Sequence, residues 1–142
     1  MRSGFSMIEL LVAVAIVAIL GAIALPAYRD YVTRGKLAEA YSLLSAQRVK
    51  MEQYYQDVRD YTNACQANTV ATPANGSYFG LACGNLSANT YTITAAGLGG
   101  SGVTGYSFTI DQSNNKATAA VPAGWSTPTP NNCWIRAKGG QC

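Results

Sequence analysis

A run of sixteen residues without a polar side chain limits what this 142-residue chain can fold into. The run extends from Leu10 to Leu25, and the charge-free stretch continues to Tyr28. Counted from Phe5, the segment would measure about 36 Å as a helix, which exceeds the roughly 30 Å of a bilayer's hydrocarbon core. The sequence therefore predicts a membrane-spanning helix over residues 5–28, surrounded by membrane lipid.

Glu9 separates this segment from an ordinary secretory signal and from a plain signal anchor. Both remain alternatives, because Ala22-Ile23-Ala24 resembles the small-residue site of signal-peptide cleavage. Neither alternative explains a carboxylate in an apolar span, which costs about 2.5–3.5 kcal/mol on insertion scales. An acid kept at that cost indicates a function for Glu9.

The hexapeptide Gly4-Phe5-Ser6-Met7-Ile8-Glu9, followed at once by the apolar run, resembles the processing site of class III signal peptides in type IV pilins. The resemblance implies that residues 1–4 form a leader peptide. It also implies a prepilin peptidase that cuts after Gly4 and methylates the new amine of Phe5. Glu9 would then be the fifth residue of the mature chain, where this family keeps its acid.

The spacing of Phe5 and Glu9 offers a mechanism for polymerisation. The mature amine and the carboxylate would lie about one helical turn apart. Moving the apolar helices from lipid into a bundle of copies gains little hydrophobic energy, so another interaction must set their register. We expect the Glu9 carboxylate of a docked subunit to pair with the Phe5 amine of an incoming copy, because a buried charge without a partner is strongly destabilising.

Gly21 and Pro26 interrupt the apolar helix. Proline has no N–H and clashes with the carbonyl four residues back, which here belongs to Ala22. The sequence therefore predicts a helix break, either a kink or a locally unwound stretch, near residues 22–26. Pilins carry a proline at this position, although relatives often have glycine where this chain has Ala18.

Residues 29–61 are predicted to form the amphipathic half of the same helix. This stretch has no proline, and its apolar side chains recur at helical spacing. They are Leu37, Tyr41, Leu44, Met51, Tyr55 and Val58. Charged and polar side chains, Glu39 among them, occupy the opposite face. We expect one continuous helix that ends near Tyr61.

Residues 62–142 are predicted to form a globular head domain. Residues 62–89 are punctuated by glycine, proline and asparagine and are expected to be a loop. Period-two alternation then predicts half-buried strands whose threonines face outward. These strands cover residues 91–95, 106–110 and 117–121, with a loose hairpin at 97–105 and a tight one at 111–116. With residues 134–136 as a fourth strand, the fold class is α+β, a long helix packed on a four-stranded antiparallel sheet.

The four cysteines all lie in this head domain, and export to an oxidising compartment favours disulfides. Three pairings are open. We expect Cys65–Cys83 and Cys133–Cys142, because each closes a local loop. No metal site is expected, since the cysteine spacings are long, no C-x-x-C occurs and the chain has no histidine. No cofactor is expected either.

The segment from Cys133 to Cys142 resembles the disulfide-closed C-terminal loop of type IV pilins. The resemblance is closest to the subunits called PilE-like, a group that includes the DNA-uptake pilin of competent bacteria. Type II secretion pseudopilins share the N-terminal motif, but their major type carries a calcium site rich in acids. Asp111 is the only acid after Asp60, which is too few hard ligands for such a site. This comparison favours a pilin.

Trp134, Arg136 and Lys138 lie in the closed segment and offer charge and stacking surface for DNA. Two cations are a small basis, and the alternative is a solvated loop with Trp134 in the core. An enzyme is not expected, because histidine is absent and no serine or threonine stands in a nucleophile motif.

Together these features predict a structural subunit of a type IV pilus, a surface fimbrium for adhesion, twitching motility or DNA uptake. The precursor is expected in the inner membrane, with the prepilin peptidase and the inner-membrane assembly platform as partners. Copies of the chain then polymerise into a cell-surface filament. A minor pilin that acts as a DNA-uptake receptor and a type II secretion pseudopilin are the alternatives.

Overall fold

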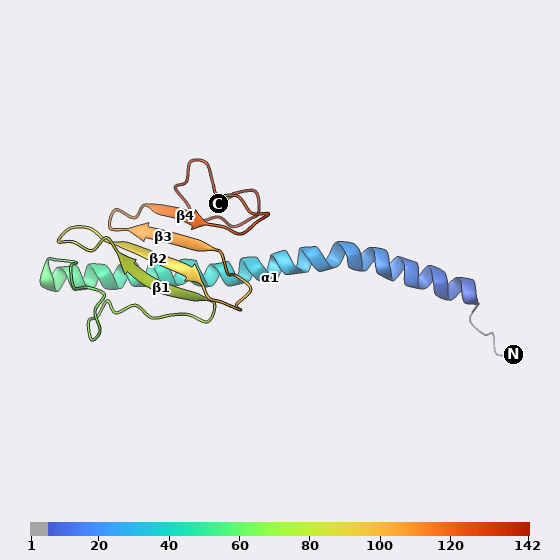
Figure 1. Ribbon diagram of the computed structural model, residues 1–142, viewed down its shortest axis with the longest axis horizontal. Coiled ribbons are helices and arrows are strands. Elements are labelled where there is room, and N and C mark those ends of the chain that lie inside the picture. Colours follow the sequence, from blue (N-terminus) through green and yellow to red (C-terminus); the bar gives the residue numbers. More distant parts are fainter. Residues whose placement is uncertain (1–5) are drawn as a thin grey trace. The chain divides into compact units, whose positions relative to one another are not determined.

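The computed structural model describes residues 6–142, so the predicted processing site at Gly4 and Phe5 lies outside the described residues. Within that range, one helix is followed by four strands (Figure 1). The elements are α1 (Met7–Val58), β1 (Phe79–Gly84), β2 (Thr92–Gly97), β3 (Ser107–Asp111) and β4 (Lys116–Ala120). The chain divides into two compact units, Met1–Thr33 and Arg34–Cys142.

The described part of the first unit is almost entirely the apolar part of α1. Ser6 is the N-cap residue of this helix. Its side-chain oxygen accepts a hydrogen bond from the Ile8 N–H at 3.3 Å, and its carbonyl accepts from the N–H groups of Glu9 and Leu10. Serine is a favoured residue at this position. By length and composition α1 could cross a membrane, and its 18-residue apolar window has a mean hydropathy of 2.8.

Pro26 lies inside α1 without ending it. The chain is helical through Gly21 and Pro26 and beyond, so a locally unwound stretch near residues 22–26 is not found, whereas a kink there stays a prediction. Proline removes the hydrogen bond to the carbonyl of Ala22 and crowds that carbonyl, but its fixed φ is itself helical. The bonds on either side are retained and keep the neighbouring turns in place.

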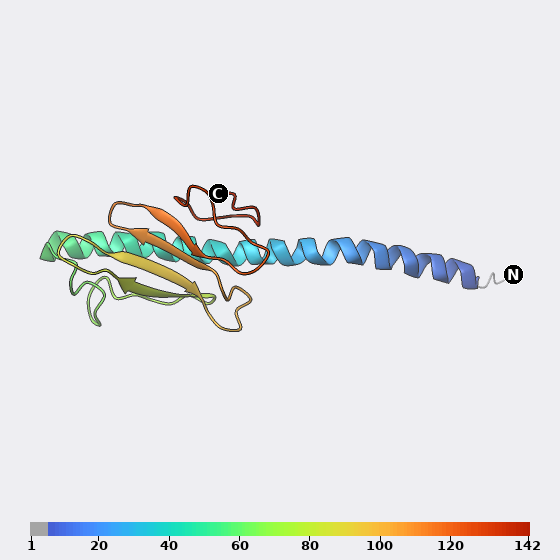
Figure 2. The same ribbon diagram turned by 45° about the horizontal axis from the view of Figure 1, so that its top comes forward.

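In the second unit, the sheet packs along the C-terminal half of α1 (Figures 1 and 2). The strand order is β1-β2-β3-β4, and each neighbouring pair is antiparallel. This confirms the predicted class of a long helix on a four-stranded antiparallel sheet. The helix contributes buried side chains at spacings of three and four, which are Leu37, Ala40, Leu44, Gln47 and Met51.

The core of the second unit is built around aromatic rings between α1 and the inner face of the sheet. The ring of Phe108 on β3 lies 5.2 Å from that of Tyr41 and 6.0 Å from that of Phe79. Phe79, Phe108 and Ile93 are completely buried. Aromatic rings at such separations stabilise the core through ring–ring contacts, in addition to the burial of their apolar surface.

The end of α1 comes earlier than the sequence predicts. The helix ends at Val58, where Arg59 takes a positive φ of 61°. A left-handed residue in this position commonly closes a helix. Val58 itself is 50% exposed, so the predicted apolar face stops short of it and the end near Tyr61 is wrong.

β1 lies inside residues 62–89, where the sequence predicts a loop, and residues 134–136 form no strand. The fourth strand of the sheet is therefore β1. It pairs with β2 over its full length, from Phe79 opposite Gly97 to Gly84 opposite Thr92. Its glycines disfavour a strand locally, and the pairing with β2 overrides that preference.

β4 presents the face opposite to the one that alternation predicts. Thr118 is completely buried, whereas Ala119 is exposed. The Thr118 hydroxyl donates to the Cys133 carbonyl at 2.8 Å and accepts from the Ile135 N–H at 3.2 Å. Thr118 thus faces inward because it fastens the C-terminal segment, and the expectation that all threonines face outward is wrong.

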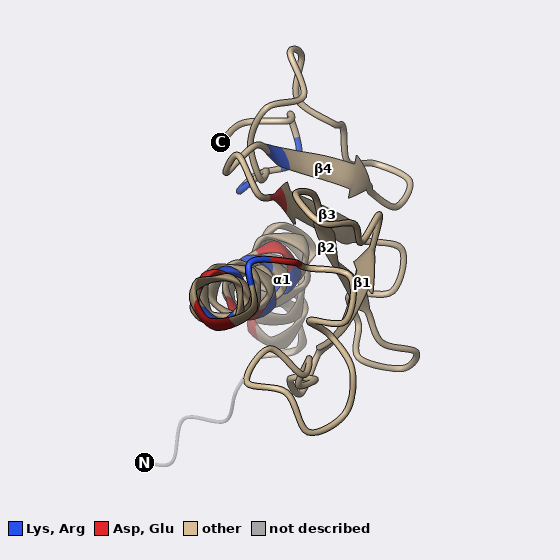
Figure 3. Cartoon of the chain, turned by 90° about the vertical axis from the view of Figure 1, so that its left-hand side faces the viewer, with Lys and Arg blue, Asp and Glu red and all other residues tan. Residues whose placement is uncertain are grey.

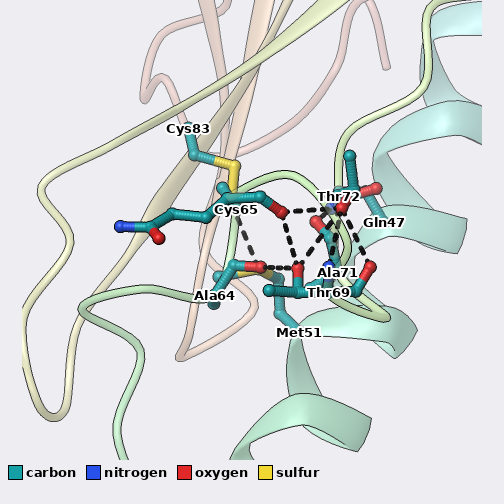
Figure 4. The surroundings of a disulfide bond; sticks show 9 residues. Gln47, Met51, Ala64, Cys65, Thr69, Ala71, Thr72 and Cys83 are labelled. Carbon is teal, nitrogen blue, oxygen red and sulfur yellow. Dashed lines mark hydrogen bonds between the residues drawn. A yellow bond between two sulfur atoms is a disulfide. The ribbon is translucent and has the colours of Figure 1, made fainter.

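Two disulfides close loops in the second unit. Cys65 is bonded to Cys83, and Cys133 to Cys142. Figure 4 shows the first of them beside a loop held by threonine hydrogen bonds. Beneath that loop the buried amide of Gln47, on α1, donates to the Ala71 carbonyl. The disulfide therefore ties β1 to a segment that is also bonded to the helix.

The helical pattern predicts that Glu39 is a solvated charge on the outer face of α1. In the structure, its carboxylate instead contacts the start of β1. Its Oε1 accepts hydrogen bonds from the backbone N–H groups of Tyr78 at 2.7 Å and Phe79 at 3.1 Å. Gly76 passes so close that a Cβ there would lie 2.2 Å from the same oxygen. The carboxylate thus fixes the start of β1 against the helix.

Replacing Glu39 with alanine is expected to lower the free energy of unfolding by about 2–3 kcal/mol, because two backbone donors lose a charged acceptor. Urea unfolding of the full chain, followed by circular dichroism, measures the loss. Glu39→Gln keeps an acceptor and should cost less, and Ser42→Ala, at an exposed helix position, is the control. Equal stability of Glu39→Ala and the control would contradict this role.

Candidate functional site

Glu9 lies in the first turn of α1, and its side chain is exposed in the single chain. Around it the described part of the first unit exposes apolar side chains on every face of the helix. Leu11 is 65% exposed, Val17 69% and Ile23 71%. An apolar surface of this extent requires cover by lipid or by other protein. Among residues 6–28, Glu9 is the only Asp, Glu, Lys or Arg.

Trp134 does not offer the exposed stacking surface that the sequence suggests. The side chain is 9% exposed, and its Nε1 donates to the Thr109 carbonyl at 2.8 Å. Its indole stacks on the Tyr41 ring at 5.4 Å, and the Lys116 ammonium lies 4.7 Å from the ring centre. The alternative reading, with Trp134 in the core, is the correct one.

Arg136 and Lys138 are exposed, as predicted, and two further cations lie near Arg136. A cavity of about 330 Å³ is lined by Arg136 and Lys116, and another of about 450 Å³ by Arg136 and Arg34; Tyr41 contributes to both. Figure 3 shows that most charges follow α1, with further basic residues on β4 and the C-terminal segment. Sequence reasoning missed Arg34 and Lys116, because they are distant from Arg136 along the chain.

Tyr41 holds the C-terminal segment to the helix beneath these cations. Its hydroxyl donates to the Ile135 carbonyl. Burial raises the pKa of Tyr41 to about 12, and the nearby Arg136 charge partly opposes that shift. The phenol therefore stays protonated and continues to donate at physiological pH.

Glu52 forms a second polar centre, at the other end of the helix–sheet interface. Its two oxygens accept hydrogen bonds from the hydroxyls of Tyr91 at 3.0 Å and Tyr61 at 3.3 Å. Burial and the Glu52 charge raise the pKa of Tyr61 to about 12, and the same causes raise the pKa of Tyr91. These phenols also remain neutral donors, so the centre joins structural elements.

Among residues 6–142, no group of three or more His, Cys, Asp or Glu side chains could hold a metal ion. The cysteines in that range are all disulfide-bonded. Two features of the described residues match the sites predicted from the sequence, the apolar helix with Glu9 and the basic surface around Arg136.

The N-terminal region and the fold both match known proteins. Residues 1–25 match the prokaryotic N-terminal methylation motif. The fold is similar to the crystal structure of the Neisseria meningitidis non-core minor pilin PilV, with a TM-score of 0.55 and 18% sequence identity. That likeness covers 70% of this chain and 96% of the PilV chain, and it shows that the chain has a pilin fold.

Residues 26–104 match the family described as "Type IV minor pilin ComP, DNA uptake sequence receptor". The chain therefore belongs to the type IV pilins. It is 37% identical over 99 residues to the fimbrial protein EcpC of Eikenella corrodens, which covers 70% of this chain. It is 46% identical over 55 residues, 39% of the chain, to the type IV major pilin protein PilE1 of Neisseria gonorrhoeae. The matches span 59% of EcpC and 33% of PilE1.

Proposed function

We propose that this chain is a filament subunit, cut after Gly4, methylated on Phe5 and polymerised from the inner membrane into a surface pilus. The observation that carries the proposal concerns the N-terminal part of α1. It exposes apolar side chains on every face and has one acid, Glu9, in its first turn. A bundle of identical helices would cover that surface. The relatives named as fimbrial proteins and a major pilin support the same role.

Intact mass and N-terminal analysis of the native protein test the processing step. The expected mature chain begins at Phe5 and carries one methyl group on its amine. The matched variant Gly4→Val should accumulate the unprocessed precursor, because the peptidase is expected to read the residue before the cut. A native chain that begins at Leu25, after Ala22-Ile23-Ala24, would instead indicate an ordinary signal peptide and overturn the proposal.

DNA binding is a second candidate function, favoured by the description of the family that residues 26–104 match. Arg34, Lys116 and Arg136 line two adjoining cavities, and Lys138 is exposed in the same C-terminal segment. Cations that approach a duplex bind its phosphates by releasing counterions, independently of base sequence. Because Trp134 is buried, binding would rest on these charges and not on its ring.

Electrophoretic mobility shift of the full chain in detergent tests this candidate. The Arg136→Ala/Lys138→Ala variant is expected to weaken duplex binding and to reduce the salt slope of log K by about 2, one unit for each lost phosphate contact. Lys50→Ala/Arg59→Ala removes the same charge elsewhere and should keep the native slope. Absence of a shift at low salt, or equal loss in both variants, would dismiss the candidate surface.

A further inference from the structure

An open cavity of about 630 Å³ lies where the β3–β4 hairpin meets the C-terminal segment. Its walls come from Thr92 on β2, Thr109 on β3, the hairpin at 111–116, and Asn131 and Asn132 after the sheet. The volume falls within the roughly 300–1,000 Å³ of small-molecule sites. The proposed polymerisation helix contributes nothing to this cavity, and the basic surface shares only Lys116 with it.

The hairpin wall is held in one conformation by Asp111. Its Oδ1 accepts from the backbone N–H groups of Ser113 and Asn115, each at 2.9 Å, and its Oδ2 accepts from the Asn115 side-chain amide at 2.8 Å. Asn114 takes a positive φ of 60° at the turn. A wall fixed in this way loses little conformational entropy when a ligand binds.

The opposite wall is fixed by Asn131. Its Oδ1 accepts from the Thr118 N–H at 2.9 Å, and its Nδ2 donates to the Thr118 carbonyl at 3.0 Å. This amide therefore occupies the free edge of β4 as a neighbouring strand would. An extended peptide cannot add to the sheet there, because the two backbone groups that it would need are taken.

Three polar side chains of the cavity have hydrogen-bonding groups that no other described residue occupies. Asn114, Asn132 and Thr109 line it, and their side chains make no hydrogen bond within residues 6–142. An asparagine amide offers two donors and an acceptor, and a threonine hydroxyl offers both kinds of group. Sugar hydroxyls also donate and accept, so this set of groups complements them.

The charges and apolar groups of the lining restrict the ligand class. Asp111 is the one acid and Lys116 the one cation among the lining residues, so the cavity has no net charge to attract an anion or a cation. Ile110, the only large apolar residue of the lining, is 2% exposed and leaves no pocket for a peptide side chain. We propose that this cavity binds a neutral carbohydrate.

The test is a titration of the full 15N-labelled chain in dodecylphosphocholine, a detergent without a sugar headgroup. The probes are the methyl glycosides of glucose, galactose, mannose and N-acetylglucosamine, which vary the hydroxyl configuration of a neutral ring. Saturable shifts of the Asn114 and Asn132 side-chain amide signals are expected with at least one of them at millimolar concentration. The Asn114→Ala/Asn132→Ala variant should weaken binding at least tenfold, read from backbone signals of 107–120.

The matched control is Asn63→Ala/Asn68→Ala, which removes two exposed amides from a different loop and should bind as the native chain does. Three results would overturn the inference. They are no saturable shift with any of the four glycosides, equal weakening in both double variants, and stronger shifts at the same signals with 3′-sialyllactose or a DNA duplex. None of them bears on polymerisation, so the inference can fail while the proposed filament role stands.

Discussion

Glu9→Val is expected to abolish assembled filaments while the chain still enters the membrane. Insertion should become easier by about 2.5–3.5 kcal/mol, because a carboxylate no longer enters hydrocarbon. Assembly should become at least about a hundredfold less favourable, since a buried amine left without its partner costs about 3–5 kcal/mol and each 1.4 kcal/mol is tenfold. The two effects have opposite signs, which distinguishes a role in assembly from a general loss of stability.

Sheared surface filaments and the membrane-bound pool, quantified from the same cells, measure the two effects. Val12→Leu alters the same exposed helix by one apolar group and should assemble normally. Glu9→Gln removes the charge with little change of shape and should resemble Glu9→Val. A normal filament yield from either Glu9 variant would show that the carboxylate does not direct assembly.

Phe108→Ala is expected to lower the free energy of unfolding by about 3–5 kcal/mol, the range for truncation of a buried aromatic ring. Phe108 is completely buried and contacts the rings of Tyr41, Phe79 and Tyr106 at centroid distances of 5.2, 6.0 and 6.4 Å. Removing the ring therefore leaves a cavity that three rigid neighbours cannot close. Urea unfolding followed by near-ultraviolet circular dichroism measures the loss.

Phe108→Leu provides the informative comparison if the alanine variant does not fold. It keeps most of the buried volume and should cost about 1.5 kcal/mol or less. Val70→Ala, at a half-exposed position, should change stability by no more than about 0.5 kcal/mol. If Phe108→Ala and Val70→Ala unfold at the same urea concentration, the aromatic cluster is not the centre of the core.

The central strands could be predicted because their two faces differ clearly in polarity. Tyr91, Ile93 and Ala95 alternate with threonines, and in the structure these three residues are buried. β4 could not be assigned in the same way, because alanine and threonine side chains differ little in size. A register shift between Ser107 and Phe108 further changes which β4 residue faces the core. Small side chains therefore left its face undetermined in the sequence.

Contacts between residues far apart in the sequence account for most of the remaining differences between the predicted and the observed structure. β1 depends on pairing with β2, and Glu39 reaches Tyr78 and Phe79 across about forty positions. Helical periodicity assigns Glu39 to the outer face, since it reports only which side of the helix a residue occupies. The basic surface was predicted in part, because Arg136 could be read from its segment whereas Arg34 and Lys116 reach it through folding.

The helix fastens the rest of the second unit through main-chain atoms. Four side chains of α1 do so, with bonds from Lys36 to the Ser101 carbonyl, from Tyr78 and Phe79 N–H to Glu39, from Tyr41 to the Ile135 carbonyl and from Gln47 to the Ala71 carbonyl. Every residue type supplies a carbonyl, and all but proline supply an N–H. Exposed loop residues can therefore change in type while the same four anchors hold the backbone in place. The helix thus tolerates sequence change in the loops that it anchors, because its bonds do not depend on their side chains.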